Sequence, residues 1–213
     1  MASRGHEKGF RGRSAEPSGN GKARILEAAI ELVGESGHAG ATISEICKRA
    51  ELGPPAVYHH FGSKEGVIAA AVEAIAASWL AELQDSLPPN GTLDQRLRKA
   101  VQGWQAAIEA PTKPVKMLLT IQLECADRSV TIRDALRRVH AGACAVVRRD
   151  LEQSGRFDDT AALADTVVGL VLAAALRFHL EPDRTALGMR LHEVARMLIS
   201  RAVSERALSR RKE

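Results

Sequence analysis

The sequence predicts an all-α protein with about nine helices, of which the first three form a small N-terminal domain. Three observations predict this fold class. Alanine, leucine, arginine and glutamate dominate the 213 residues, and all four favour helices. Apolar residues recur at intervals of three and four in most segments, whereas the alternation of a half-buried strand is rare. Glycine and proline mark the breaks, most clearly in the run Pro88-Pro89-Asn90-Gly91.

The first two helices are predicted over about 22–36 and about 42–50. Gly37 follows the first helix and suits the left-handed residue that closes a helix. Thr42 and Glu45 have the spacing of a capping box, which predicts that each side chain accepts a hydrogen bond from the other residue's backbone N–H. The second helix is apolar on one face, through Ile43, Ile46, Cys47 and Ala50.

A third helix is predicted after a break at residues 51–53. Pro54 and Pro55 suit its first turn, where a missing backbone N–H has little effect. Val57 and Phe61 lie four residues apart and are expected to point inward, so the early outward positions of this helix stay exposed. Two short helices joined in this way form a helix-turn-helix, in which the second helix enters a groove of DNA.

Residues 22–66 resemble the DNA-binding domain of the TetR family (tetracycline-repressor type). The most diagnostic run is VYHHFGSKE at 57–65, where the family usually shows an aliphatic residue, Tyr, a polar or aromatic pair, Phe, and a Ser-Lys-Glu opening. The turn departs from the family, which commonly has Gly and then a Ser or Thr cap. This chain has Glu51 and Gly53 there, and Pro55 replaces a small residue.

The resemblance implies a sequence-specific transcriptional regulator, most readily a ligand-released repressor that binds a palindromic operator as a homodimer. It implies a DNA-binding domain over 20–80, with its motif at 43–62, and a C-terminal effector-binding and dimerisation domain over 81–213. Double-stranded DNA and an unidentified small molecule are the expected partners. Tyr58 and Lys64 resemble phosphate contacts of the family. The expected DNA-contacting residues are Thr42, Lys48, Gly53, Pro54, Pro55, Ala56, Tyr58, His59 and Lys64.

Charge alone does not mark this end of the chain as a DNA-binding domain. Residues 20–66 carry five Lys or Arg and six Glu, a net charge of −1, although the whole chain has +4. The basic tail over 1–19 is rich in glycine and serine and is expected to be disordered. It is either an arm that follows phosphates or a neighbouring minor groove, or a solvated tail without a role.

Six further helices are predicted, and side chains that suit helix N-caps mark the start of several. They begin after Ser63, after Thr92 (paired with Gln95), near 115, near 129, after Asp158 or Asp159, and at Pro182-Asp183, the last reaching about 206.

The eighth predicted helix carries no charge between Thr166 and Leu176. A helix that is apolar on every side must be buried on nearly every side, and one chain of this size cannot easily surround it. Together with the ninth helix it predicts a four-helix bundle between two chains. The alternative is an ordinary core helix within one chain. The expected dimer interface comprises Val167, Leu170, Val171, Ala174, Leu191, Val194 and Leu198.

Polar or bulky residues on otherwise apolar faces are candidates for an effector pocket, and they favour an apolar effector of modest size. At helical spacing Trp104 and Met117 are more often core residues than pocket residues, and His140 fits an ordinary surface histidine. Cys125 or Cys144 fits a redox sensor, although nothing in the sequence indicates a depressed thiol pKa. The candidates are Trp104, Met117, Ile121, Cys125, His140, Cys144 and His179.

Several other classes are disfavoured. The three cysteines lack CxxC spacing, so we expect neither a metal site nor a disulfide framework, and no cofactor. Motifs of nucleophilic, phosphate-binding or metal-dependent enzymes are missing from the sequence, which predicts that the protein is not an enzyme. With no signal-peptide core or membrane-length apolar run, we expect a cytoplasmic protein. The alternative is an all-helical interaction scaffold or small-molecule-binding protein without DNA binding.

Overall fold

The structure, a computed structural model, describes residues 18–86, 91–109, 112–125 and 127–209. Within these ranges all regular structure is helical, which confirms the predicted fold class. The predicted basic tail lies almost entirely outside the described residues, because α1 begins at Ser18. The nine helices described are α1 (Ser18–Gly40), α2 (Ile43–Ala50), α3 (Pro54–Phe61), α4 (Lys64–Ser86), α5 (Leu93–Glu109), α6 (Thr112–Cys125), α7 (Val130–Ser154), α8 (Thr160–Leu180) and α9 (Arg184–Ser209).

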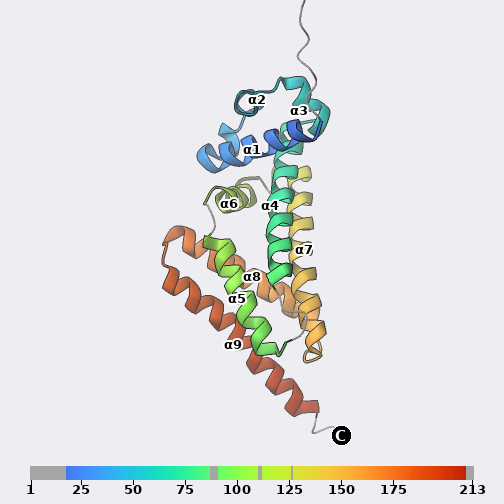
Figure 1. Cartoon of the computed structure of the whole chain (residues 1–213), viewed down its shortest axis with the longest axis vertical. Coiled ribbons are helices and arrows are strands. Elements are labelled where there is room, and N and C mark those ends of the chain that lie inside the picture. The colour runs from blue at the N-terminus through green and yellow to red at the C-terminus, as the bar shows by residue number, and fades with distance from the viewer. Residues whose placement is uncertain (1–17, 87–90, 110–111, 126, 210–213) are drawn as a thin grey trace, which may run out of the picture.

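Helices α1, α2 and α3 form one end of an elongated molecule (Figure 1). Helices α4 and α7 run side by side away from this end, and α5, α8 and α9 form the opposite end. Helix α6 packs against α1, so it lies where the two ends meet. The long axis of α4 therefore connects the three-helix end to the rest of the molecule.

Two apolar cores follow from this arrangement. The first joins α1–α4 to α6 and to the start of α7, and its fully buried members include Ile25, Val57, Ile68 and Met117. The second joins α5, α8 and α9 to the end of α7 around Leu191. The expected division of the chain at 80/81 falls inside α4, and α6 contributes to the first core. The three-helix end and the C-terminal segment therefore share packed side chains.

Most helix ends match the capping residues that the sequence indicates. Ser63 Oγ accepts a hydrogen bond from the N–H of Gly66 at the start of α4, at 3.0 Å. Thr92 and Gln95 form a complete capping box, with N···O distances of 3.0 and 3.3 Å. At α8 the cap is Asp159, whose carboxylate accepts from the N–H of Ala162 at 2.9 Å. Asp183 accepts from Ala186 at 3.0 Å in the same way at the start of α9.

Two helix ends near the start of the chain differ from the expectation. The helical path of α1 is interrupted at Gly37, whose φ of 72° and ψ of −178° no other residue type adopts readily, and a short turn continues to Gly40. Only half of the first capping box forms. Thr42 Oγ1 accepts from the N–H of Glu45 at 3.2 Å, whereas the N–H of Thr42 donates to the carbonyl of Gly40 at 2.9 Å.

One buried ion pair lies within the second core. Arg96 of α5 donates to the carboxylate of Asp150 on α7, and also to Gln153 Oε1 at 2.9 Å. Both members of the pair are buried. Charges are retained in a core when they are paired and hydrogen-bonded, and the cost of removing one partner is then large. The pair therefore ties α5 to α7 at a defined register.

Candidate nucleic-acid interface

Helix α3 presents its outer face to solvent because its inner face is anchored by a single buried residue. Val57 is fully buried, whereas Tyr58 is 53% exposed and His59 is also exposed. Pro54 and Pro55 at the start of the helix are exposed too. The side chains that were expected to meet DNA on this helix therefore lie on its accessible side.

The start of α3 has an unusual shortage of backbone donors. Gly53 is its N-cap and offers no side-chain oxygen, and the first two helical residues, Pro54 and Pro55, have no N–H. The N–H of Ala56 donates to the Gly53 carbonyl at 3.0 Å. Hydrogen-bonded recognition from this helix therefore has to come from side chains further along, of which Tyr58 is one.

Thr42 is exposed at the start of α2, but its backbone N–H is not available to a phosphate. That N–H donates to the Gly40 carbonyl at 2.9 Å. The hydroxyl of Thr42 and the following turn of α2 remain at the surface, where the positive end of the helix dipole favours an anion. Lys48, near the other end of α2, is exposed as well.

Lys64 is half-buried, unlike most of the other expected contacts. Its Nζ donates to the carbonyl oxygen of His38 at 2.6 Å. The residue therefore joins the start of α4 to the end of α1, in addition to any contact with DNA. Ala56 is also half-buried, and it offers only a methyl group.

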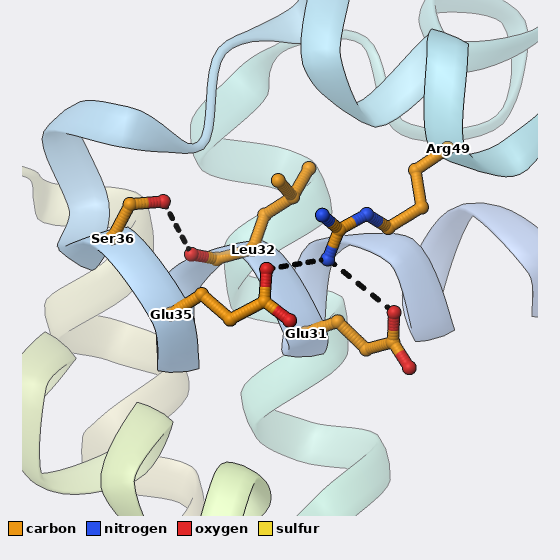
Figure 2. Close-up of polar contacts among 5 residues, drawn as sticks. All are labelled: Glu31, Leu32, Glu35, Ser36 and Arg49. Atoms are coloured by element: carbon orange, nitrogen blue, oxygen red, sulfur yellow. Dashed lines mark hydrogen bonds and ion pairs between the residues drawn. The ribbon is translucent and has the colours of Figure 1, made fainter.

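The acidic side chains of this domain are largely held on α1 and around the turn. Figure 2 shows Arg49 of α2 between Glu31 and Glu35 of α1, with Nη1···Oε2 distances of 3.4 and 2.8 Å. Arg24 binds the carboxylate of Glu51 at 2.9 Å. These three acids meet arginines rather than lie on the exposed face of α3. The net charge of −1 for residues 20–66 therefore does not describe the charge at the DNA-facing surface.

The turn between α2 and α3 is the segment in which this sequence differs from the pattern of the family that it resembles. Glu51 has φ 51° and ψ 41°, a left-handed conformation that favours glycine, and it is the one non-glycine residue with positive φ among those described. The N–H of Leu52 donates to the Cys47 carbonyl at 3.0 Å, which closes α2. The backbone of the turn is thus the one that glycine usually supplies, with glutamate in its place.

Residues 25–71 match the family model described as bacterial regulatory proteins of the tetR family. This match spans α2, α3 and the turn whose geometry is given above. The chain belongs to the TetR family. It is therefore a DNA-binding transcriptional regulator, in a family of regulators rather than of enzymes.

Known transcriptional regulators are similar in sequence to this chain over most of its length, which supports this assignment. The HTH-type transcriptional regulator BetI of Burkholderia ambifaria is 24% identical over 165 residues, which cover 73% of this chain and 82% of that protein. BetI of Burkholderia mallei is 25% identical over 162 residues, with the same shares covered. The similarity therefore continues beyond the helix-turn-helix.

Solved structures share the fold at lower identity. A transcriptional regulator from Rhodococcus sp. Rha1 superposes with a TM-score of 0.73 at 22% identity, covering 84% of this chain and 96% of that one. FadR of Bacillus subtilis, solved in complex with stearoyl-CoA, superposes with a TM-score of 0.69 at 16% identity, covering 84% and 97%. The C-terminal helices of this TetR-family chain thus follow an arrangement found in other regulators.

The seven expected effector-pocket residues do not surround a common cavity. Met117, Ile121 and Cys125 are buried in the first core, between α6 and the DNA-binding helices. His179 is half-buried, with its Nδ1 2.9 Å from the Ala175 carbonyl oxygen. Helical spacing identified these side chains as inward-facing but could not tell which of the two cores they enter. The structure divides the seven candidates between the first core, the second core and the surface, so a role for any of them in effector binding stays a prediction.

Among the described residues, Trp104 is the member of that set that lines a small cavity in the second core. The cavity measures about 20 Å³, enough for roughly one water molecule. Its walls are apolar apart from Asp150, which is already paired with Arg96. The remaining lining residues are Leu97, Ala100, Val146, Val147, Leu151 and Leu198.

The residues expected at the dimer interface differ in how much surface they offer to a second chain. Five of them are buried within one chain: Val167, Ala174, Leu191, Val194 and Leu198. Leu170 is exposed and Val171 is half-buried. Periodicity located the apolar helices. It could not distinguish the apolar side that packs in the chain's own core from the apolar side that stays exposed. The large apolar residues exposed on α8 and α9 are Leu170, Leu172, Leu176, Leu180, Met189, Met197 and Val203.

Helix α8 is long and apolar enough to cross a membrane by length and composition alone, and core helices of soluble proteins meet the same criterion. Only 22% of its most apolar window is buried within one chain. The expectation that this helix is buried on nearly every side is therefore not met by one chain. Much of its apolar surface remains uncovered.

A cluster of potential metal ligands was missed by the sequence analysis. His140 and Cys144 of α7 lie beside Asp165 of α8, with their ligand atoms all within 4.8 Å of one another. The i, i+4 spacing of the first two was visible in the sequence, but the third lies in the next helix. Burial raises the pKa of the Cys144 thiol, with Asp165 adding to the effect, and burial likewise raises the pKa of Cys47 and Cys125. A raised pKa argues against the redox-sensor reading, which requires a thiolate.

Proposed function

We propose that this TetR-family regulator is a ligand-released repressor that binds a palindromic operator as a homodimer. The observation that carries the proposal is the exposed apolar surface of α8. Leu170, Leu172 and Leu176 are 37%, 37% and 38% exposed, on a helix without charge between Thr166 and Leu176. An uncovered surface of this kind is characteristic of a protein–protein interface.

A second copy of the chain is the partner that best fits this surface. Helices α8 and α9 each bury one side in the second core and leave another apolar side free, so two copies can form a four-helix bundle across a two-fold axis. Two α3 helices are then related by the same axis. Half-sites on DNA should lie about 34–36 Å apart, or a multiple of that distance.

The proposed roles on DNA follow from exposure and chemistry. Tyr58 donates its hydroxyl to a phosphate, and Lys48 and Lys64 supply positive charge. His59 is the exposed side chain of α3 with hydrogen-bonding reach toward base edges, and Pro55 with Ala56 offers apolar contact to a thymine methyl group. Gly53 and Pro54 allow close approach of the backbone.

The proposed effector is a small apolar molecule that enters the second core near Trp104. The apolar walls there support this chemistry, as does the apolar acyl chain of the stearoyl-CoA with which the similar FadR of Bacillus subtilis was solved. A cavity of about 20 Å³ must widen to admit such a ligand. The ligand therefore favours a conformation with separated helices, and it releases DNA if that conformation binds the operator less well.

Contacts between α6 and α1 support a route from the effector to the DNA-binding helices. Glu124 of α6 accepts a hydrogen bond from the backbone N–H of His38 at 3.2 Å. That contact lies at the end of α1, next to the kink at Gly37. A displacement of α6 thus acts on the helix that supports α2 and α3. The site of action we propose is the cytoplasm, where operator DNA is found.

Selection of genomic fragments by the purified full-length chain tests the proposal. The expected result is a set of fragments that share an inverted repeat, bound by two chains as measured by sedimentation. Recovery of single, unrepeated half-sites bound by one chain would overturn the dimer reading. For the effector, an apolar fluorescent dye such as phenylnaphthylamine should bind the wild type and lower its operator affinity. Ala100→Leu, which fills the cavity, should weaken dye binding without changing dye-free operator affinity.

A further inference from the structure

Helices α7 and α8 bring together a histidine, a cysteine and an aspartate at the surface of the molecule. His140 Nε2 lies 2.9 Å from Asp165 Oδ1 and 3.5 Å from Cys144 Sγ. His140 and Cys144 are one helical turn apart on α7, so their side chains emerge on the same side of that helix. Asp165 approaches from the first turns of α8.

These separations match the edges of a tetrahedral metal site. With zinc bonds of about 2.0 Å to nitrogen and oxygen and about 2.3 Å to sulfur, ligand atoms should lie roughly 3.3 Å (N···O) and 3.5 Å (N···S) apart. The observed N···S distance agrees with this geometry, and the N···O distance is shorter by a few tenths of an ångström. All three ligand atoms lie within 4.8 Å of one another. Small side-chain rotations are enough to complete the site.

The charge and the exposure of the cluster also suit a divalent cation. Thiolate and carboxylate together supply two negative charges, and a borderline-soft donor set of this kind favours zinc over calcium or magnesium. The neighbouring cations on α7 already have carboxylate partners, since Arg137 binds Asp134 and Arg138 binds Glu73. The side chains of His140 and Asp165 are 48% and 71% exposed, so a fourth position can be taken by water.

We propose that His140, Cys144 and Asp165 form a binding site for a zinc-type divalent cation that links α7 to α8. Ligation replaces the thiol proton of Cys144, which is released to solvent, and uses the unprotonated Nε2 of His140. The ion then holds the start of α8 against the middle of α7. Because α8 carries the apolar surface described above and α7 lies alongside α4, the site is placed between the dimer face and the helix that leads to the DNA-binding end.

Cobalt(II) titration of the full-length protein, without DNA, tests the site independently of the proposed repressor function. Cobalt stands in for zinc and reports thiolate ligation by an intense near-ultraviolet charge-transfer band. The expected result is one cobalt ion per chain, with the band displaced by zinc. Cys144→Ser should abolish the band, and His140→Ala and Asp165→Asn should each weaken binding at least about tenfold.

Matched controls separate this site from adventitious binding. His192→Ala and Asp94→Asn remove exposed ligands of the same types elsewhere, and both should bind cobalt like the wild type. Zinc at about 100 times its Kd should also raise Tm by about 5–10 °C in the wild type and not in Cys144→Ser. If the band survives Cys144→Ser, or if no band appears at millimolar cobalt, the cluster is not a metal site but a surface ion pair beside a thiol.

Discussion

The ammonium group of Lys64 lies 2.6 Å from the backbone carbonyl oxygen of His38, so the first residue of α4 binds the end of α1. The carbonyl belongs to the short turn that follows the kink at Gly37. A positive charge near a helix C-terminus satisfies one of the carbonyls that lack helical partners. The residue that the family resemblance marked as a phosphate contact is thus also part of the framework that orients α1 against α4.

Substitution of this lysine should lower stability as well as DNA affinity. Lys64→Met keeps the apolar stem and removes the ammonium group, so the free energy of unfolding should fall by about 1.5–3 kcal/mol. Urea denaturation with an unchanged m-value measures the effect. Lys48→Met, at an exposed position, should change stability by less than about 0.5 kcal/mol. Equal stability of the two variants would contradict the framework role.

Tyr58 is expected to act on phosphates and therefore on all sequences alike. Tyr58→Phe removes the hydroxyl and should weaken binding to the operator and to a scrambled duplex by a similar factor, about two- to tenfold. Fluorescence anisotropy with both duplexes at several salt concentrations provides the measurement. A loss confined to the operator would instead assign Tyr58 to base recognition.

His59 should determine sequence preference rather than overall affinity. His59→Ala removes a hydrogen-bonding side chain from the exposed face of α3, which should relax preference at one or two operator positions by about 1–3 kcal/mol each. Selection from a randomised operator library measures the preference at every position. Tyr58→Phe serves as the comparison, because its selected sequences should match those of the wild type.

A charge on the exposed side of α8 should dissociate the proposed dimer. Leu170→Arg places a guanidinium at the proposed interface, and sedimentation should then show single chains and a loss of operator binding. Leu123→Arg is the matched control, since Leu123 is 76% exposed on α6, a helix that packs mainly against α1. A Leu170→Arg protein that still sediments as a dimer would place the interface elsewhere.

Mild acidification should lower the free energy of unfolding, because His38 becomes protonated. Burial, with the charge of Lys64 adding to it, lowers the pKa of His38 below its ordinary 6.5. The unfolded chain then binds the proton more readily than the folded chain. His38 therefore contributes stability above about pH 6.5, and this contribution is lost as the pH falls through its lowered folded-state pKa.

Urea denaturation of the wild type and of His38→Gln between about pH 7.5 and pH 5.5 measures this contribution. The wild type should lose more stability over the interval than the variant does. Equal losses of stability in the two proteins would show that His38 does not cause the pH dependence. Within the described residues Nε2 of His38 is buried and has no hydrogen-bond partner, so protonation there adds a donor without an acceptor.

The helices were predictable because their ends and periodicity are local properties. Thr92 with Gln95 and Asp159 each cap the helix that the sequence assigned to them. What could not be predicted depends on which surfaces meet. Val167 and Leu170 lie on one apolar helix, yet one is buried in its own chain and the other is exposed. The approach of Asp165 to His140 requires α7 and α8 to be placed in space, which no spacing along the chain encodes.

Helix α4 begins beside the DNA-binding helices and continues without a break for 23 residues, a length of about 34 Å. A tilt of α4 is therefore transmitted along its whole length to its ends. A tilt of about 10° in a rod of this length moves its end by about 6 Å, which is roughly half the width of the major groove. In the proposed dimer, small adjustments among the C-terminal helices that pack against α4 are thus sufficient to change the distance between the two α3 helices, and with it their fit to two half-sites on DNA.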